Sequence, residues 1–219
     1  MPDFLKQRRA MVSRYKKGGY ISSKATEEAV LSVPREEFMP KEHKNYAYMD
    51  QPFPLPGDGR QTISAPYMYP VTYEALKLDI GEKFLEIGAG SGYGAAIARE
   101  LVGYKGLVVT IEINKKTCNF AKKNLERAGY DDVIIIHGDG TLGYKEKAPY
   151  DAISITASTP RIPDPLKVQL SSPGRIIAPV GEKNYFGQDL VLVERDELGE
   201  FREKSIMKVQ YVPLLGKFE

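Results

Sequence analysis

The chain has 219 residues, of which 42% are hydrophobic and 27% charged, as is ordinary for a globular protein. Its 31 Lys and Arg against 29 Asp and Glu leave a net charge of +2, which argues against a chain built mainly to neutralise a phosphate backbone. No apolar run approaches the roughly 18 residues of a membrane span, and no apolar secretory region follows the first methionine. We therefore expect a cytoplasmic protein that has no membrane partner.

Cysteine and histidine are scarce. Cys118 is the single cysteine and cannot form an internal disulfide, which fits a reducing compartment. Only His43 and His137 accompany it, so a structural zinc site of Cys and His is excluded. A carboxylate metal site is not excluded by this count, but we expect no metal. Cys118 lies in a segment predicted to be helical, where a buried and inert thiol is more common than a nucleophile.

The N-terminal 50 residues are predicted to be helical, and the family resemblance described below implies that they form a cap on the sheet. Apolar residues from Phe4 onward recur at helical spacing, and this first helix should end near Gly18. A second helix is predicted over residues 23–32. From Lys6 to Lys24, both included, there are seven basic residues and no acidic one, which we interpret as a solvated helix face rather than as a site for an anionic partner.

Residues 51–70 differ in composition from the rest of the chain. The stretch 51–66 holds four Pro and two Gly, and loops of about 15 residues without regular structure are usually functional or disordered. The apolar residues Phe53, Leu55 and Ile63 argue against disorder. We therefore interpret residues 51–70 as a functional loop, and the family resemblance described below implies that this loop contacts substrate and cofactor.

From residue 71 onward strands alternate with helices. This pattern predicts an α/β fold with a Rossmann-like, doubly wound, mostly parallel sheet covered on both faces. The last strands have no helices between them, so antiparallel pairing is expected at that edge. The whole chain, 1–219, is then one domain. The predicted strands are 83–87, 107–111, 133–136, 151–156, 175–180, 190–194 and 207–212, and the predicted helices are 93–102, 115–128 and one near 165–170.

A glycine-rich turn follows the first of these strands. Gly88, Gly90 and Gly92 would let the backbone turn tightly and approach a ligand closely, although a plain strand–helix turn has the same glycines. Glu112 ends the next strand, 22 residues after Gly90, where a carboxylate can accept both ribose hydroxyls. In a dinucleotide fingerprint the third glycine would fall at Tyr93. An adenosine without phosphate, joined to an amino acid, therefore fits better than a nicotinamide dinucleotide.

The glycine order resembles the class I S-adenosylmethionine-dependent methyltransferases, whose first cofactor motif is Glu-x-Gly-x-Gly-x-Gly. In that family an acidic residue after the third strand lies near the adenine, and Asp139 occupies this place within Gly138-Asp139-Gly140. The Asn/Asp-Pro-Pro-Tyr/Phe stretch of amino-methylating enzymes is replaced by residues 156–160, Thr-Ala-Ser-Thr-Pro, which disfavours that chemistry. Cys118 is not on a loop, as a cytosine-methylating enzyme would require.

The proline-rich segment carries a narrower resemblance. Asp50-Gln-Pro-Phe-Pro-Leu-Pro and Gln61-Thr-Ile-Ser-Ala-Pro-Tyr-Met resemble the signature region of the protein-L-isoaspartate (D-aspartate) O-methyltransferases. The family usually has Gly directly before Gln-Thr-Ile-Ser, whereas Arg60 intervenes here. Further matches follow the family order along the chain: Val33-Pro-Arg-Glu-Glu-Phe-Met-Pro, Gly138-Asp-Gly, Ala148-Pro-Tyr-Asp-Ala-Ile, Ile162-Pro, Gln169-Leu, Gly174-Arg, Pro179-Val-Gly and Val212-Pro-Leu.

The resemblance implies a protein repair enzyme. It would transfer a methyl group from S-adenosyl-L-methionine to the free α-carboxylate of L-isoaspartyl residues and release S-adenosyl-L-homocysteine. The methyl ester would then close to a succinimide and reopen partly to normal aspartate. The partners would be isoaspartyl-containing peptides and proteins, and we expect a monomer. The resemblance leaves open whether D-aspartyl residues are accepted.

Site residues follow from the same resemblance. Ser64 would be the catalytic residue, because the family places its functional serine in the Thr-Ile-Ser motif, although a plain turn before Pro66 is the alternative. Substrate would be bound by Thr62, Ile63, Ser64 and Ala65. Cofactor would be bound by Gln61, Thr62, Ser64, Tyr69, Glu86, Gly88, Ala89, Gly90, Glu112, Ile113, Gly138, Asp139, Gly140 and Thr156.

Two other functions stay open at this point. An RNA methyltransferase would use the basic N-terminal helix as its electrostatic footprint and yield no ester, although nucleic acid is not the partner we expect. A cofactor-binding homologue without catalysis would have Arg60 closing the peptide groove.

Overall fold

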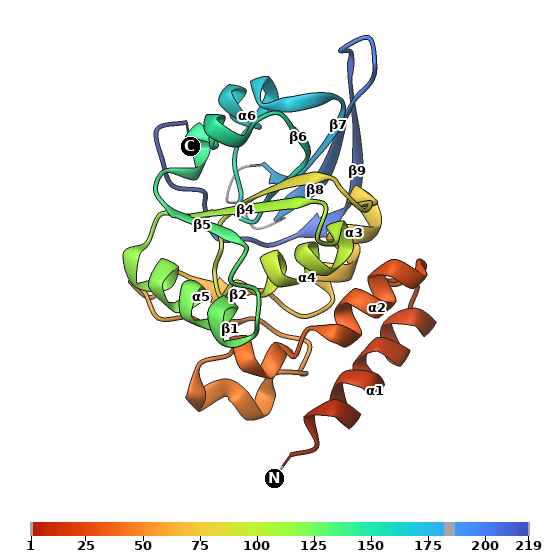
Figure 1. The fold of residues 1–219 in the computed structure, drawn as a ribbon, viewed down its shortest axis with the longest axis vertical. Helices are drawn as coiled ribbons and strands as arrows, with labels where there is room; N and C mark the ends of the chain where they lie inside the picture. The colour runs from red at the N-terminus through yellow and green to blue at the C-terminus, as the bar shows by residue number, and fades with distance from the viewer. Residues whose placement is uncertain (1, 182–186, 219) are drawn as a thin grey trace.

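A computed structural model describes residues 2–181 and 187–218. Its centre is a seven-stranded sheet with the strand order β5-β4-β3-β6-β7-β8-β9 (Figure 1). The strands are β3 (Lys83–Ile87), β4 (Leu107–Glu112), β5 (Ile134–His137), β6 (Tyr150–Ile155), β7 (Leu170–Val180), β8 (Gln188–Arg195) and β9 (Phe201–Val209).

The sheet is mixed, as predicted. Its first five strands run parallel, whereas β8 is antiparallel to both β7 and β9. On β3, the middle one of the five parallel strands, Leu85 pairs with Val109 on one side and Ile153 on the other, and all three side chains are buried. Central parallel strands are covered on both faces, which explains why their sequences are nearly continuous apolar runs.

The helices are α1 (Phe4–Lys17), α2 (Lys24–Ser32), α3 (Met68–Leu76), α4 (Tyr93–Val102), α5 (Lys115–Arg127) and α6 (Asp164–Val168). On one face of the sheet, α4 packs against β3 and β4, α5 against β4 and β5, and α3 against β7. The opposite face is covered more thinly, by the short α6 and by the turns η3 (Gly140–Leu142) and η4 (Lys145–Lys147). Both faces are thus covered, but only one of them by long helices.

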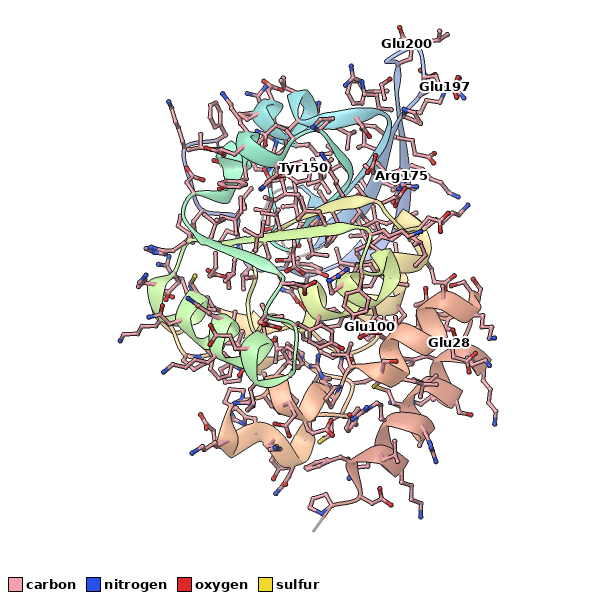
Figure 2. All side chains as sticks on the ribbon, viewed as in Figure 1. Glu28, Glu100, Tyr150, Arg175, Glu197 and Glu200 are labelled. Atoms are coloured by element: carbon pink, nitrogen blue, oxygen red, sulfur yellow. The ribbon has the colours of Figure 1, made fainter. Side chains whose placement is uncertain are left out.

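The N-terminal segment packs outside this core. Helices α1 and α2 lie on the outer side of α4 (Figure 1), and the 3-10 turns η1 (Arg35–Phe38) and η2 (Lys41–Tyr46) follow them. Asp3 caps α1 and Ser23 caps α2, each accepting a hydrogen bond from a backbone N–H of the first turn. Glu28 of α2 and Glu100 of α4, labelled in Figure 2, line a cavity of about 450 Å³ between the two helices.

Residues 51–70 contain more regular structure than predicted. Two short strands, β1 (Phe53–Pro54) and β2 (Thr62–Ile63), pair antiparallel, and α3 begins already at Met68. Pro70 lies in the first turn of α3, where a backbone N–H has no intrahelical acceptor and proline is tolerated. No helix within residues 2–181 and 187–218 has the length and apolar character needed to cross a membrane.

Candidate active site

The glycine turn follows β3 and lies against the carboxyl end of the neighbouring strand β6. Gly88, Gly90 and Gly92 have φ values of 95°, 54° and 86°, which side chains disfavour. A Cβ atom at Gly88 would also collide with Thr156 Oγ1. This hydroxyl, which follows β6, lies 2.9 Å from each of the carbonyl oxygens of Ile87 and Gly88 and donates to them. The close approach of the two strand ends therefore depends on glycine at position 88.

Glu112 connects the end of β4 to this turn. Its Oε2 accepts from the Gly90 N–H at 3.0 Å, and its Oε1 accepts from the Asn114 N–H at 3.0 Å. Burial raises the pKa of Glu112, and these backbone hydrogen bonds oppose the rise. An ionised carboxylate has about four acceptor positions, so Glu112 can still accept from a ribose hydroxyl. Glu112 thus fits the adenosine moiety predicted from its spacing.

Glu86 is the second carboxylate at the glycine turn. It is 3% exposed, and its Oε2 accepts from the Thr110 hydroxyl at 2.7 Å. Burial raises the pKa of Glu86 to about 8; the nearby Glu112 adds to the rise and the Thr110 hydroxyl opposes it. Glu86 also lines a cavity of about 750 Å³, which is described below. A positively charged ligand group in that cavity would favour the ionised form of Glu86.

The proline-rich segment closes over this end of the sheet as a hairpin. The Leu55 N–H donates to the Gln61 carbonyl at 2.9 Å, which continues the pairing of β1 and β2. Thr117 of α5 donates from Oγ1 to the Pro56 carbonyl at 2.8 Å and anchors the hairpin tip. These bonds order a segment that its composition alone would assign to a loop.

Arg60, the residue that interrupts the family signature, lies at the edge of the hairpin. Its Nε and Nη2 donate to Asp58 Oδ2 at 3.1 and 2.5 Å, and its backbone N–H donates to Oδ1 at 3.2 Å. Arg60 holds the pKa of the Asp58 carboxyl below its usual range. The side chain is 60% exposed, so the guanidinium is folded back onto its neighbour at the cavity rim.

Ser64 follows β2 and is half-buried at the cavity wall. Its carbonyl oxygen accepts from Nη2 of Arg35 at 2.8 Å. Its side chain lies near Tyr211, which follows β9; burial raises the pKa of this tyrosine, and the Ser64 hydroxyl opposes the rise. Segments far apart in the sequence therefore meet at this serine.

The cavity has a volume of about 750 Å³ and lies at the carboxyl ends of β3, β4 and β6. Ligands of open α/β sheets bind at this edge, where the strand order reverses, and the volume is within the usual range for small-molecule sites. Residues 59–69 form one wall and residues 209–215 another, and members of both line the cavity. The cavity is large enough for an adenosine bound to an amino acid, with room beside it for part of a peptide.

Comparison with known proteins identifies the family. A family model described as "Protein-L-isoaspartate(D-aspartate) O-methyltransferase (PCMT)" matches residues 6–219. The chain belongs to the protein-L-isoaspartate O-methyltransferase family. The protein-L-isoaspartate O-methyltransferase of Methanothermobacter thermautotrophicus is 44% identical over 211 residues, 96% of either chain, and that of Methanothrix thermoacetophila is 47% identical over 199 residues, 91% of either chain.

Solved structures of this family share the fold. One protein-L-isoaspartate O-methyltransferase matches with a TM-score of 0.87 and 34% identity, over 96% of this chain and 67% of its own. A second, the putative Plasmodium falciparum enzyme in complex with S-adenosyl-L-homocysteine, matches with a TM-score of 0.81 and 24% identity, over 95% and 98% of the two chains.

Family membership confirms the predicted fold class and activity. The chain is an S-adenosylmethionine-dependent protein-L-isoaspartate O-methyltransferase, an enzyme of protein repair whose substrates are isoaspartyl-containing proteins. The RNA-methyltransferase alternative loses its support, because the family acts on protein carboxyl groups.

Most of the predicted site residues line this cavity of about 750 Å³. Ile63, Gly138 and Asp139 are not among its lining residues. Ile63 packs into the core, and Asp139 instead accepts from the backbone N–H groups of Thr141 and Lys217 at 2.9 and 2.8 Å. An adenine contact by Asp139 stays a prediction. The lining residues that were predicted are Gln61, Thr62, Ser64, Ala65, Tyr69, Glu86, Gly88, Ala89, Gly90, Glu112, Ile113, Gly140 and Thr156.

Other lining residues were missed. Tyr211 lies 147 positions after Ser64 along the chain, and no short motif links the two. The match of Val212-Pro-Leu to the family order was the available signal that this segment belongs to the site. Arg35 was likewise present in a matched segment but had no assigned role. The missed lining residues include Tyr67, Thr72, Tyr73, Ser154, Tyr211 and Leu215.

Proposed function

We propose that Ser64 and the backbone N–H of Ala65 bind the free α-carboxylate of an isoaspartyl residue and orient it for methylation. Ser64 borders the same cavity as Glu112 and the glycine turn, and this shared cavity is the observation that supports the assignment. Among the described residues no group accepts from the Ala65 N–H, so this donor is free for a carboxylate oxygen. Neutral donors directed at a carboxylate make strong, charge-assisted hydrogen bonds.

The cofactor end of the cavity is proposed to be the glycine turn. Glu112 would hold the ribose hydroxyls, Gly88 and Gly90 would allow the backbone to approach the adenosine, and Glu86 would face the positively charged end of the cofactor. S-adenosyl-L-methionine supplies a methyl group on a positively charged sulfur. A buried carboxylate such as Glu86 stabilises a cation that has lost its hydration.

The chemistry needs no general base from this chain. An α-carboxyl group has a pKa of about 3.3–3.7 and is already ionised near neutrality, so it can attack the methyl carbon directly. The carboxylate oxygen–carbon bond forms as the carbon–sulfur bond breaks, and the bonding electrons remain on sulfur. The residues Ser64 and Ala65 then act by placing the oxygen in line with the methyl group. Well-oriented reactants can gain about 7–11 kcal/mol over free ones.

The enzyme is proposed to need only this transfer. The methyl ester closes to a succinimide without further help from the protein, and the succinimide reopens partly to normal aspartate. We also propose that the protein acts as a monomer in the cytoplasm. A cavity walled by one chain and a lone buried thiol at Cys118 support these two assignments.

The Ser64→Ala variant tests the assignment. We expect kcat for an isoaspartyl peptide to fall by about two orders of magnitude, as when one oriented donor is removed, while the Kd for S-adenosyl-L-homocysteine stays within about threefold. Ser205→Ala is the matched control, because this exposed serine of β9 hydrogen-bonds through its side chain to Asp189 and does not line the cavity. Near-normal turnover by Ser64→Ala would refute the role of Ser64.

A further inference from the structure

Arg35 is a fully buried cation in the N-terminal cap. It is 0% exposed and is the largest of the fully buried side chains. Within residues 2–181 and 187–218 no carboxylate forms an ion pair with it. A buried charge without a carboxylate is costly, so the surrounding structure has to stabilise it in other ways.

Carbonyl oxygens and aromatic rings provide that stabilisation. Nε donates to the Ala47 carbonyl at 2.7 Å, and Nη2 donates to the Ser64 carbonyl at 2.8 Å. The guanidinium carbon lies 5.6 Å from the ring centre of Tyr69 and 5.1 Å from that of Tyr93. Cations at this distance from an aromatic face are attracted by its quadrupole. A single side chain thus joins the cap, the Ser64 loop and the first residue of α4.

The turn that carries Arg35 is itself held rigidly. Arg8 of α1 donates from Nε to the Tyr48 hydroxyl at 2.8 Å and from Nη2 to Glu36 Oε1 at 3.0 Å. The Tyr48 hydroxyl donates in turn to Glu36. Since Glu36 directly follows Arg35, this buried network restricts where the guanidinium can lie.

We propose that Arg35 is a positioning residue for the methyl-transfer reaction, acting by fixing the peptide plane between Ser64 and Ala65. This inference rests on the proposed role of Ser64. In a planar trans peptide the C=O and the N–H point in opposite directions. Arg35 does not line the cavity, whereas Ser64 and Ala65 do. By holding the Ser64 carbonyl, Arg35 makes the Ala65 N–H point away from the guanidinium and restricts the Ser64 side chain.

Lysine cannot replace arginine in this position. The planar guanidinium presents several donors in fixed directions, which lets it reach two carbonyls while lying between two rings. An ammonium group is a compact point charge on a flexible stem. Misplacing a reacting group by about 1 Å can cost about a hundredfold in rate. We therefore expect R35K to lower kcat by about ten- to a hundredfold and to leave the Kd for S-adenosyl-L-homocysteine within about threefold.

R99K is the matched control for a buried arginine. Arg99 is 6% exposed, pairs with Asp132 and contacts the Gly103 carbonyl, at the end of α4 away from the cavity. R99K should lower the Tm as R35K does, yet keep kcat within about threefold. R35Q is a second variant at this position, which keeps an N–H donor but loses the charge. Cooperative unfolding and binding of S-adenosyl-L-homocysteine are measured first for each variant, to show that it is folded.

The decisive experiment is a double-mutant cycle of R35K and S64A in the full chain, with steady-state methyl transfer to an isoaspartyl peptide as the readout. If Arg35 acts through Ser64, the factor by which kcat falls in the double variant is much smaller than the product of the factors for the two single variants. Fully multiplicative losses, or R35K and R35Q with kcat within about threefold of the unchanged enzyme, would overturn the inference. Normal turnover by S64A alone would instead refute the role of Ser64.

Discussion

The Glu112 carboxylate and the Gly90 N–H form a hydrogen bond of 3.0 Å that joins the end of β4 to the glycine turn after β3. The carboxylate is thereby fixed before any ligand arrives. A preorganised group loses little conformational entropy when it binds.

For Glu112→Ala we expect the Kd for S-adenosyl-L-homocysteine to rise at least about tenfold, because charge-assisted hydrogen bonding to the ribose is lost. Glu126→Ala is the control, since Glu126 is an exposed residue of α5 that pairs only weakly with Lys122. Isothermal titration calorimetry measures both. An unchanged affinity in Glu112→Ala would remove this residue from the cofactor site.

The close packing at Gly88 gives a second test. Gly88 and Gly81 have nearly equal φ values of 95° and 93°, but only a Cβ at Gly88 would meet another group, Thr156. Alanine at either position should cost about 1 kcal/mol of stability through backbone strain. We expect Gly88→Ala to lower the Tm further and to weaken binding of S-adenosyl-L-homocysteine at least about tenfold, with Gly81→Ala binding normally. Equal effects of the two variants would contradict the close approach.

The raised pKa of Glu86 predicts a dependence of stability on pH. Its pKa is about 8 in the folded chain, against an ordinary value of 4.5. Between these two pH values the folded state keeps a proton that the unfolded state has released. The free energy of unfolding therefore falls as pH rises from about 4.5 to about 8. Burial also raises the pKa of Glu112, which acts in the same direction.

Glu86→Gln isolates the contribution of this one carboxyl, since glutamine is similar in shape and does not titrate. Without cofactor, we expect the Tm of the variant to exceed that of the unchanged protein by several degrees at pH 9, at roughly 2–4 °C per kcal/mol. The difference should shrink at pH 5. A Tm difference that is the same at both pH values would contradict the raised pKa.

Arg60 is expected to be a tolerated departure from the family signature. Its exposed pair with Asp58 contributes little to stability, so Arg60→Gly should keep the Tm within about 1 °C. Because the guanidinium folds back at the rim, kcat for an isoaspartyl peptide should stay within about threefold of that of the unchanged enzyme. A tenfold or larger rise in kcat in Arg60→Gly would show instead that Arg60 obstructs the peptide groove.

Much of the fold was accessible from the sequence because local signals agreed with tertiary packing. The run Lys83–Ile87 is apolar apart from Lys83 and Glu86, and glycines follow it, so strand and turn were both predicted. The helix α3 was misjudged because Pro66 and Pro70 suggested a loop. Position decides the effect of proline, and Pro70 falls in the one turn where it costs nothing.

The less accessible parts depend on contacts between distant segments. The strand β9 spans Phe201–Val209 rather than 207–212, because pairing with β8 extends it through a charged stretch that has no strand pattern. Arg35 and Tyr211 reach Ser64 only after the chain has folded. Their residue types carry no catalytic signal, since a lone arginine or tyrosine is compatible with any surface or core.

The most direct measurement is methyl transfer from labelled S-adenosyl-L-methionine to an isoaspartyl peptide, to its normal aspartyl twin and to bulk RNA. We expect base-labile label on the isoaspartyl peptide alone, because only there does a free α-carboxylate reach Ser64 beside the cofactor. Label on RNA, or equal label on both peptides, would contradict the assigned activity. Cofactor binding with no label on any substrate would contradict it as well.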